Sequence, residues 1–406
     1  MTIAVLGGGF QGCCIALALA DRGQSVVIFE RNQVVLSRTA IANEGKVHLG
    51  WMYAADPSLA TARMMMEGAL AFAPFLHRYL GLPIESLATS EPASYVVHRD
   101  SQHTAAKVRE YFAAVHRLIV DASNGRQGAY FGSDLTVSPR EWSAQERASV
   151  FDPAIAVAAF DTPEIAIDPV ALAQHVQRAL TSHPRIELRC AHEVLGVSEE
   201  ATGVVVKTSG AHGQKLERFD HAVNALWEGR LSVDETAGLR PGRPWLHRLK
   251  YGVGFSWPDR LPRPPSATFV SGPFGEIVSY PDKTTYLTWY PTCVKAMSSD
   301  LVPPRWSTHP PEPLRSEIVH GTIQALSKFV RALAPVDATE LKDVWVKGGA
   351  IVAWGETDID DPESELHRRY EIGVHTRSRY HSVDPGKLTM APYFADKCAD
   401  RIVAGI

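Results

Sequence analysis

The feature that most constrains the fold of this chain is a glycine-rich turn close to its N-terminus. The apolar run Ile3 to Leu6 is followed by Gly7, Gly9 and Gly12, which have the G-x-G-x-x-G spacing. A helical stretch and a second apolar run come next, and that run ends at Glu30. A lone glycine motif would also suit an ordinary structural turn. Because strand, turn, helix and terminal acid occur together here, we predict a βαβ unit that binds a dinucleotide.

Each residue of this turn has its own expected task. Gly7 permits the tight turn, Gly9 lets the backbone approach a pyrophosphate, and Gly12 lets the helix lie close to the strand. The helix is predicted from Cys13 to Arg22, and the free N–H groups at its start favour phosphates. Glu30 suits ribose hydroxyls and disfavours a 2′-phosphate, so NADP is not expected. The predicted nucleotide contacts are Gly7, Gly9, Phe10, Gln11, Gly12, Glu30 and Arg31.

Length and composition narrow the class of protein. At 406 residues the chain exceeds what one hydrophobic core usually supports, so we expect two domains. Its net charge of −4 carries mixed signs throughout, which argues against a nucleic-acid surface or a polybasic membrane patch. Cysteines without a C-x-x-C pair, an early first strand and the lack of a membrane-spanning run predict a cytoplasmic protein without a signal peptide. Scattered histidines and a missing G-x-S-x-G motif argue against a metal site and a hydrolase.

The rest of the chain predicts an α/β fold with a discontinuous nucleotide-binding domain. Asp56 and Asp168, each followed by proline, are expected to cap two helices. Runs between residues 186 and 229 predict a short strand, a three-stranded meander and a return strand to a parallel sheet. Segment 240–264, rich in proline and arginine, is expected to cross between domains, and a long helix is predicted over 313–333. The nucleotide-binding domain is assigned to residues 1–83, 151–238 and 345–406, and a second domain with an antiparallel sheet to 84–150 and 239–344.

Three sequence blocks together resemble the D-amino-acid oxidase (DAO) superfamily of FAD-dependent oxidoreductases. They are the N-terminal glycine motif with its acid, the segment Val223 to Gly229, and Asp384-Pro385-Gly386-Lys387-Leu388-Thr389. They follow one another in the family's order and span essentially the whole chain.

A further block, Asn43 to Tyr53 followed by Asp56-Pro57-Ser58-Leu59, is similar to a particular branch of that family. It resembles the N-S-G-x-I-H-A-G-x-Y-Y-x-P-G-S-L segment of L-2-hydroxyglutarate oxidases and dehydrogenases. Glu44, Leu49 and Met52 depart from that segment, so the substrate stays open.

The resemblance implies a Rossmann-type, glutathione-reductase-like FAD-binding domain beside a substrate domain built on an antiparallel sheet. FAD would occupy the nucleotide site, with the turn Gly386 to Thr389 beside its isoalloxazine ring and the following helix facing the N1/C2 edge. The loop Asn43 to Gly50 would run beside the flavin, Val194 would hold adenine through its backbone, and Asn224 to Gly229 would turn close to the pyrophosphate and ribose. The further cofactor contacts implied are Asn43, Gly45, Lys46, Val47, His48, Val194, Asn224, Ala225, Trp227, Gly386, Lys387, Leu388 and Thr389.

His48 has three possible roles at this point. It can hydrogen-bond or pack against the flavin, which we favour, act as a base or electrostatic partner for the substrate, or carry the flavin covalently. Yellow colour that stays with denatured protein would establish the covalent link.

The residues that contact the substrate are harder to predict from the sequence than those that bind the cofactor. Many amino-acid oxidases of the family carry a G-x-R-P segment whose arginine grips the substrate carboxylate, but the corresponding segment Val346 to Ile351 has no arginine. A standard amino acid is therefore less expected. The candidate substrate contacts are Lys250, Tyr251, Tyr280, Tyr290, Lys347 and His375, with His48, Tyr251 and Lys347 expected to act in catalysis.

We predict an FAD-dependent oxidoreductase that oxidises a CH–OH or CH–NH centre of a small polar metabolite by hydride transfer to flavin N5. The electron acceptor is O₂ or a quinone or carrier. Two alternatives stay open: a nicotinamide-dependent dehydrogenase, and a non-catalytic nucleotide-binding or regulatory protein that kept the fold.

Overall fold

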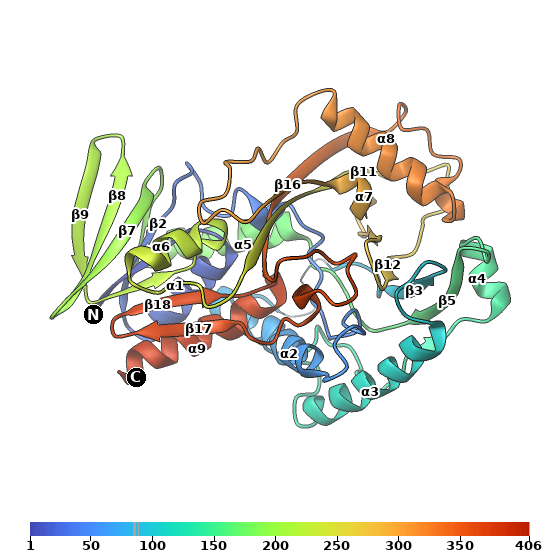
Figure 1. Ribbon diagram of the computed structural model, residues 1–406. Helices are drawn as coiled ribbons and strands as arrows, with labels where there is room; N and C mark the ends of the chain where they lie inside the picture. Colours follow the sequence, from blue (N-terminus) through green and yellow to red (C-terminus); the bar gives the residue numbers. More distant parts are fainter. Residues whose placement is uncertain (84–86, 88, 406) are drawn as a thin grey trace.

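The computed structural model describes residues 1–83, 87 and 89–405 of the chain. Figure 1 shows both termini at the same end of the molecule, beside a six-stranded sheet with order β17-β18-β10-β1-β2-β6. A nine-stranded sheet forms the other part, with order β15-β11-β14-β13-β12-β3-β5-β4 and β16 paired with β11. A three-stranded meander, β7-β8-β9, completes the strands of the described chain. The predicted fold class, a Rossmann-type domain beside a largely antiparallel sheet, is confirmed.

The six-stranded sheet is parallel except for one edge strand. Five neighbouring strands run in the same direction, in the order β18, β10, β1, β2 and β6, and β17 pairs antiparallel with β18. Side chains of β1 alternate: Ile3 and Val5 join the helical layer, whereas Ala4 and Leu6 face the meander. The strands are β1 (Thr2–Leu6), β2 (Ser25–Phe29), β6 (Ile186–Arg189), β10 (His221–Asn224), β17 (Gly373–Arg377) and β18 (Tyr380–Asp384).

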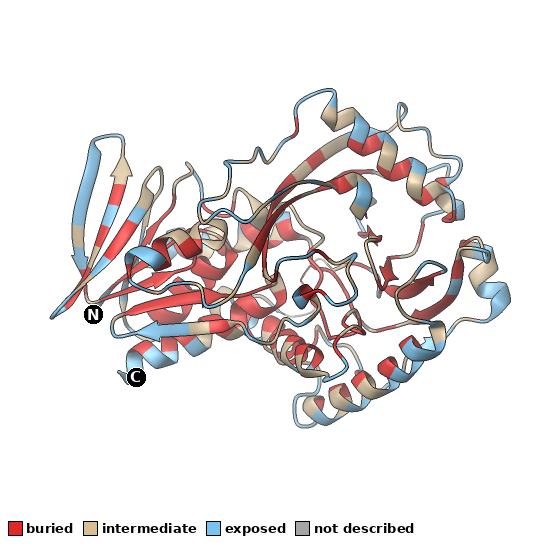
Figure 2. Ribbon diagram, viewed as in Figure 1, coloured by how far each residue is buried: buried red, intermediate tan, exposed pale blue. Residues whose placement is uncertain are grey.

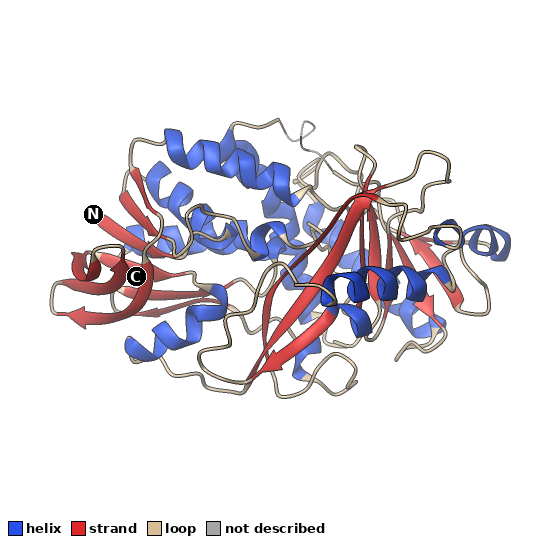
Figure 3. Cartoon of the chain, turned by 90° about the horizontal axis from the view of Figure 1, so that it is seen from above, coloured by secondary structure: helices blue, strands red, loops and turns tan. Residues whose placement is uncertain are grey.

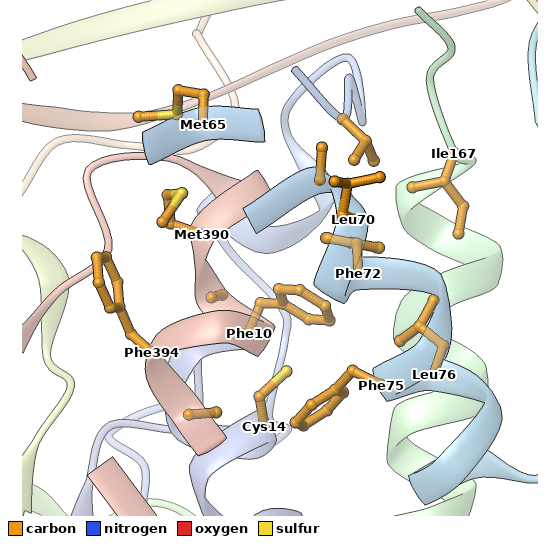
Figure 4. Packing of buried hydrophobic residues seen from close by; sticks show 14 of the residues in the cluster. Phe10, Cys14, Met65, Leu70, Phe72, Phe75, Leu76, Ile167, Met390 and Phe394 are labelled. Atoms are coloured by element: carbon orange, nitrogen blue, oxygen red, sulfur yellow. The ribbon is translucent and has the colours of Figure 1, made fainter. Parts of the chain in front are cut away.

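Four helices cover one face of this sheet. Figure 4 shows how Phe10, Phe72 and Met390 meet in the core between them. Met65 and Met66 are buried in the same core, where their flexible side chains fill the space between the helices. The helices are α1 (Phe10–Asp21), α2 (Ala60–Leu80), α5 (Pro169–Ser182) and α9 (Ala391–Ala404).

The meander and a short helix cover the opposite face. Phe219 and Val206 pack there against Leu6 and Phe29, so the sheet lies between two layers. Figure 2 shows the exposed outer strand of the meander and the buried sheet strands beneath it. The elements are β7 (Glu193–Glu200), β8 (Gly203–Gly210), β9 (Gly213–Phe219) and α6 (Arg230–Thr236).

The nine-stranded sheet has one face packed on helix α8 (Leu314–Ser327) and the other face turned towards the first sheet. Leu249 and Val253 pack against Ile318 and Leu326 of the helix. Figure 3 shows the long strands of this sheet beside the helix-rich part that carries the termini. All pairs are antiparallel except β3 with β12. The strands are β3 (Ser94–His98), β4 (Arg140–Glu141), β5 (Ala156–Asp161), β11 (Trp245–Ser256), β12 (Ala267–Val270), β13 (Gly275–Ser279), β14 (Thr284–Trp289), β15 (Val294–Ser298) and β16 (Lys342–Trp354).

The remaining helices of the described chain lie around this second sheet. The long helix α3 carries Phe112, which packs edge-on against Tyr95 of β3 and Phe160 of β5. They are α3 (Ala105–Ser123), α4 (Ala144–Val150) and α7 (Tyr290–Cys293).

Several predicted boundaries differ from the structure. Segment 240–264, expected to be a crossing, contains the 12-residue strand β11, because its apolar residues alternate between the prolines. The helix predicted over 313–333 ends at Ser327 and is followed by a 3₁₀ turn, Arg331–Leu333.

The two predicted helix caps behave differently. Asp168 accepts the N–H groups of Val170 and Ala171, as expected of an N-cap. The other helix starts at Ala60, three residues beyond the predicted first position, and Asp56 accepts the N–H of Thr61 from outside the helix. The prediction was wrong there because the loop makes one more turn before the helix.

Strand pairing bears on the predicted division into domains, which stays a prediction. Strands β5 and β16 pair within the nine-stranded sheet, although the boundaries at 151 and 345 assign both to the nucleotide-binding domain. The boundary at residue 84 lies outside the described residues. No helix among the described residues is both long and apolar enough to span a membrane.

Candidate active site

One cavity of about 380 Å³ lies where the two large sheets meet. Its wall is formed by the turn after β1, the ends of β2 and β10, the turn before α9, and strands β11, β13 and β14. Ligands of open α/β folds bind at such carboxyl ends of parallel strands. The cavity is therefore the candidate site for both the nucleotide and the substrate.

The N-terminal glycine turn has the geometry that its spacing predicts. Gly7 has a φ of +105°, and a Cβ there would lie 2.8 Å from the carbonyl oxygen of Ala225. A Cβ on Gly12 would lie 2.0 Å from the carbonyl oxygen of Gly7, so the helix packs directly on the turn. A Cβ on Gly9 would meet nothing within 4 Å, and Gly9 lines the cavity. The backbone is thus open for close approach at Gly9.

Glu30, at the end of the second strand, also lines the cavity. Its carboxylate accepts the N–H of Gly8 at 2.9 Å and the N–H of Asn32 at 2.8 Å. Arg31, the next residue, pairs with Glu228 from the segment after β10. The acid is therefore held in place at the predicted ribose position.

The C-terminal turn reaches the same cavity from the other side. Asp384 accepts the N–H of Gly386 at 3.0 Å and is itself held by Arg230 at 3.0 Å. Gly386 adopts a positive φ of +59°. Gln11, in the first turn of α1, donates to the carbonyl oxygen of Ala391 at 3.1 Å. The two glycine turns, at opposite ends of the chain, are thus bonded to each other.

His48 lies on the loop between these turns, with partners on both ring nitrogens. Nδ1 is 3.1 Å from a carboxylate oxygen of Glu164, and Nε2 is 3.3 Å from Nζ of Lys387. Burial and the neighbouring Lys387 lower the pKa of His48, so the imidazole is neutral near pH 7. Burial and Arg369 lower the pKa of Lys387 to about 8. An amine with such a pKa can lose its proton close to neutral pH.

Lys46 anchors the same loop to the nine-stranded sheet. Its ammonium lies 2.8 Å from the carboxylate of Glu276 and donates to Thr268, and its side chain is 1% exposed. Burial opposes the charge of Glu276, but Lys46 and Lys250 hold the pKa of that carboxyl below its usual range. The pair is a buried ion pair between the loop and β13.

Two arginines face the substrate side of the cavity. Nε of Arg369 donates to the carbonyl oxygen of Leu366 at 3.0 Å, and no side chain among the described residues pairs with its two terminal nitrogens. Arg248 is held by Asp358 and Tyr290, each at 2.7 Å from Nη1. Arg369 thus lines the cavity as a fixed cation whose free edge, the two terminal nitrogens, has no side-chain partner among the described residues.

Most predicted cofactor contacts line the cavity. The predicted residues found in its wall are Gly7, Gly9, Phe10, Gln11, Glu30, Arg31, Asn43, Lys46, His48, Ala225, Trp227, Gly386, Lys387 and Leu388, with Lys250 and Tyr290 from the substrate set. Those that do not line it are Gly12, Gly45, Val47, Val194, Asn224 and Thr389, with Tyr251, Tyr280, Lys347 and His375 from the substrate set.

The two other residues expected to act in catalysis are not brought to His48. Tyr251 belongs to the face of β11 that packs on α8, and its hydroxyl donates to the carbonyl oxygen of Ser307 at 2.9 Å. Nζ of Lys347 lies over the ring of Trp345, 5.1 Å from its centroid. The structure therefore gives neither residue access to the cavity.

Sequence reasoning missed Glu164, Arg248, Glu276 and Arg369. Period-two alternation along β11 could have placed Arg248 with Lys250 on one face and Tyr251 on the other. The other three lie on different elements, and their sequence surroundings carry no motif. No group of three metal-binding side chains gathers anywhere in the part of the chain that the structure describes.

The residues present fit FAD, the cofactor that the resemblance implies. Gly9 and Glu30 would hold the pyrophosphate and ribose, and the turn at Gly386 would lie beside the ring. Gln11 lines the cavity with a buried side-chain oxygen that has no partner, which leaves an acceptor for a bound group. One cavity thus joins the nucleotide turn to the C-terminal turn.

Comparison with known proteins agrees with this arrangement. The family model "DAO: FAD dependent oxidoreductase" matches residues 2–366. Similar solved structures include L-alpha-glycerophosphate oxidase from Mycoplasma pneumoniae with FAD bound (15% identity, TM-score 0.66, 100% of this chain and 95% of that one). Iminodiacetate oxidase from Chelativorans sp. BNC1 (14%, 0.67, 100% and 96%) and L-proline dehydrogenase from P. horikoshii (16%, 0.64, 100% and 93%) share the fold. No curated protein sequence matches the chain.

The family match covers most of the chain, and it confirms the predicted cofactor, FAD, over the nicotinamide alternative. The chain belongs to the DAO family of FAD-dependent oxidoreductases.

Proposed function

We propose that this enzyme oxidises a CH–OH or CH–NH carbon of a small metabolite that carries an acidic group. The observation that carries the proposal is the content of the cavity: the Lys387 and His48 pair lies in the same space as the free edge of Arg369. A proton acceptor and an anion anchor in one cavity are what such an oxidation needs.

Arg369 is the proposed anchor. Its terminal nitrogens can donate two parallel hydrogen bonds to a carboxylate or phosphate, in place of the arginine that segment 346–351 lacks. The neighbours named above act on glycerophosphate, iminodiacetate and proline, all small molecules with an acidic group. The similarity of residues 43–59 to L-2-hydroxyglutarate enzymes adds 2-hydroxy acids to the compounds to test first.

Lys387 is the proposed proton acceptor. Nζ, as a neutral amine, takes the proton of the substrate's O–H or N–H group, and Nε2 of His48 accepts a hydrogen bond from the ammonium formed. The C–H bond breaks with its electron pair as the C=O or C=N bond forms, and bound FAD supplies the acceptor for that hydride. Phe274 and Ile359 add apolar side chains to the wall of the same cavity.

Anaerobic mixing of the FAD-loaded enzyme with hydroxy acids, amino acids, phosphate esters and neutral polyols tests the proposal. We expect bleaching of the flavin absorbance by acidic compounds only. Bleaching by neutral compounds alone would contradict it, and photoreduction without reduction by any compound would favour a non-catalytic protein. Reoxidation of the bleached enzyme by air distinguishes O₂ from a quinone or carrier as acceptor.

A matched pair of arginine variants tests the anchor. Arg369→Gln should weaken substrate binding about 10- to 100-fold, because a charge-assisted pair contributes about 1.5–3 kcal/mol. Arg368→Gln, the exposed neighbour, should leave it unchanged. Equal effects of the two substitutions would remove Arg369 from the site.

A further inference from the structure

A buried carboxylate next to the catalytic pair has no role in the proposed chemistry so far. Glu164 follows β5 on the segment that leads to α5, and it is 0% exposed. It comes from neither glycine turn and does not line the cavity. A charge in such a place needs an explanation, because burial of an unpaired carboxylate costs several kcal/mol.

Three donors converge on this carboxylate. Nδ1 of His48 lies 3.1 Å from one oxygen, to which the hydroxyl of Tyr95 also donates. The N–H of Leu49 donates to the other oxygen at 2.7 Å. Glu164 thus holds the ring of His48 and the backbone of the next residue at the same time.

The pairing decides which ring nitrogen carries the proton. An ionised carboxylate only accepts hydrogen bonds, so Nδ1 of His48 must be the N–H donor. The neutral ring then has its lone pair on Nε2, and Nε2 points to Nζ of Lys387. The opposite tautomer would place two acceptors against each other at Glu164 and, once Lys387 is an ammonium, two donors against each other at Lys387.

We propose that Glu164 is the positioning residue of this active site: it fixes His48 as the Nδ1–H tautomer and so makes Nε2 the acceptor that Lys387 uses. This inference rests on the proposed function, in which the Lys387 and His48 pair takes the substrate proton. Carboxylates that fix the tautomer of a metal-bound histidine contribute about 10- to 100-fold to activity, and we expect an effect of the same order for Glu164.

The charges around the ring are consistent with this assignment. Although burial opposes it, the hydrogen bond from His48 and the charge of Lys46 hold the pKa of Glu164 below its usual range, so the carboxyl stays ionised. Burial raises the pKa of Tyr95, which keeps its hydroxyl a donor. The titratable groups that face His48 are Lys387, Glu164, Lys46, Glu276 and Tyr53.

Nitrogen NMR of the histidine-labelled, FAD-loaded enzyme reads the tautomer directly, with His48→Gln to assign the signal. We expect protonated Nδ1 and bare Nε2 in the wild type at pH 7. Glu164→Gln should abolish this preference and lower kcat 10- to 100-fold with less than a twofold change in KM. Asp161→Asn, a carboxylate that binds Arg140 and Trp142 and does not line the cavity, is the matched control and should change neither.

A protonated Nε2 in the wild type, or an unchanged tautomer and kcat in Glu164→Gln, would overturn the proposal. If Glu164→Gln does not fold, Tyr95→Phe decides: removal of one donor strengthens the bond from His48, so its Nδ1–H signal should move downfield. A signal that stays in place would show that Glu164 does not hold the Nδ1–H group and would overturn the proposal. Because the tautomer is read without turnover, failure to find a substrate would refute the proposed function and leave this test intact.

Discussion

Removal of one partner of the Lys46 and Glu276 ion pair should destabilise the protein far more than removal of both. The pair joins the His48 loop to β13, and the two side chains are 1% and 9% exposed. Glu276→Gln leaves the ammonium of Lys46 buried beside a neutral amide. Lys46→Met combined with Glu276→Gln removes both charges and with them most of the penalty.

The expected magnitude follows from the burial. An uncompensated charge in such a site costs about 3–5 kcal/mol. For 406 residues the entropy of unfolding is about 0.85 kcal/mol/K, so about 4 kcal/mol lowers Tm by about 5 °C. The exposed pair Arg260 and Glu340 gives the scale of a surface interaction, and Glu340→Gln should lower Tm by about 1 °C or less.

Thermal unfolding followed by far-UV circular dichroism at pH 7.5, with saturating FAD, measures all four proteins. We expect Glu276→Gln to melt clearly lowest, and the double variant to recover at least half of the loss. A shift in Glu276→Gln no larger than that of Glu340→Gln would refute the reasoning. So would a double variant that melts as low as the single one, because the cost would then not come from the unpaired charge.

Three further predictions concern the cofactor and its surroundings. Below pH 8, kcat/KM should rise about tenfold per pH unit, and above pH 8 it should level off. Burial and Arg369 lower the pKa of Lys387 to about 8, and the amine must be neutral to accept a proton. A flat profile from pH 6 to 9 would count against this role of Lys387. Gly9→Ala should keep the Tm of the apoprotein and weaken FAD binding at least about tenfold in a fluorescence titration. Gly12→Ala should lower the Tm of the apoprotein, because of the two added Cβ atoms only the one at residue 12 meets the backbone, 2.0 Å away. Similar Tm values of the two variants would contradict this reasoning. Acid denaturation should release all flavin, because Glu164 and Lys387 engage both ring nitrogens of His48, and yellow precipitate would show the covalent link instead.

The cofactor half of the site could be predicted because its signals are local in sequence. Gly7 and Gly12 lie too close to the backbone for a Cβ, Gly9 leaves its side of the turn open, and the turn, helix and second strand follow within 30 residues. The C-terminal turn at Gly386 was predicted through the resemblance to the family. The hydrogen bond from Gln11 to Ala391, which links it to the first turn, joins residues 380 positions apart. Neither sequence segment contains a pattern that predicts this bond.

The substrate half was predicted poorly because its residues meet only after the two sheets dock. Tyr251 and Lys250 are neighbours in sequence, yet β11 turns them to opposite faces, one towards α8 and the other towards the cavity. Treating segment 240–264 as a crossing hid that alternation. Arg369 lies in an irregular stretch between β16 and β17, where no periodicity exists to mark it.

The loop that carries Lys46 and His48 shows why the two halves depend on each other. Both basic side chains are buried, and each is compensated by an acid from beyond the first sheet: Glu276 on β13 for Lys46, and Glu164 after β5 for His48. Both acids are buried themselves, so removal of either one leaves its basic partner without a carboxylate in a site with little access to solvent. The docking of the nine-stranded sheet therefore fixes His48 beside the C-terminal turn together with the hydrogen bond from the His48 N–H to Thr389 at 2.9 Å. A perturbation at that sheet should reach the pair of His48 and Lys387 through these two acids.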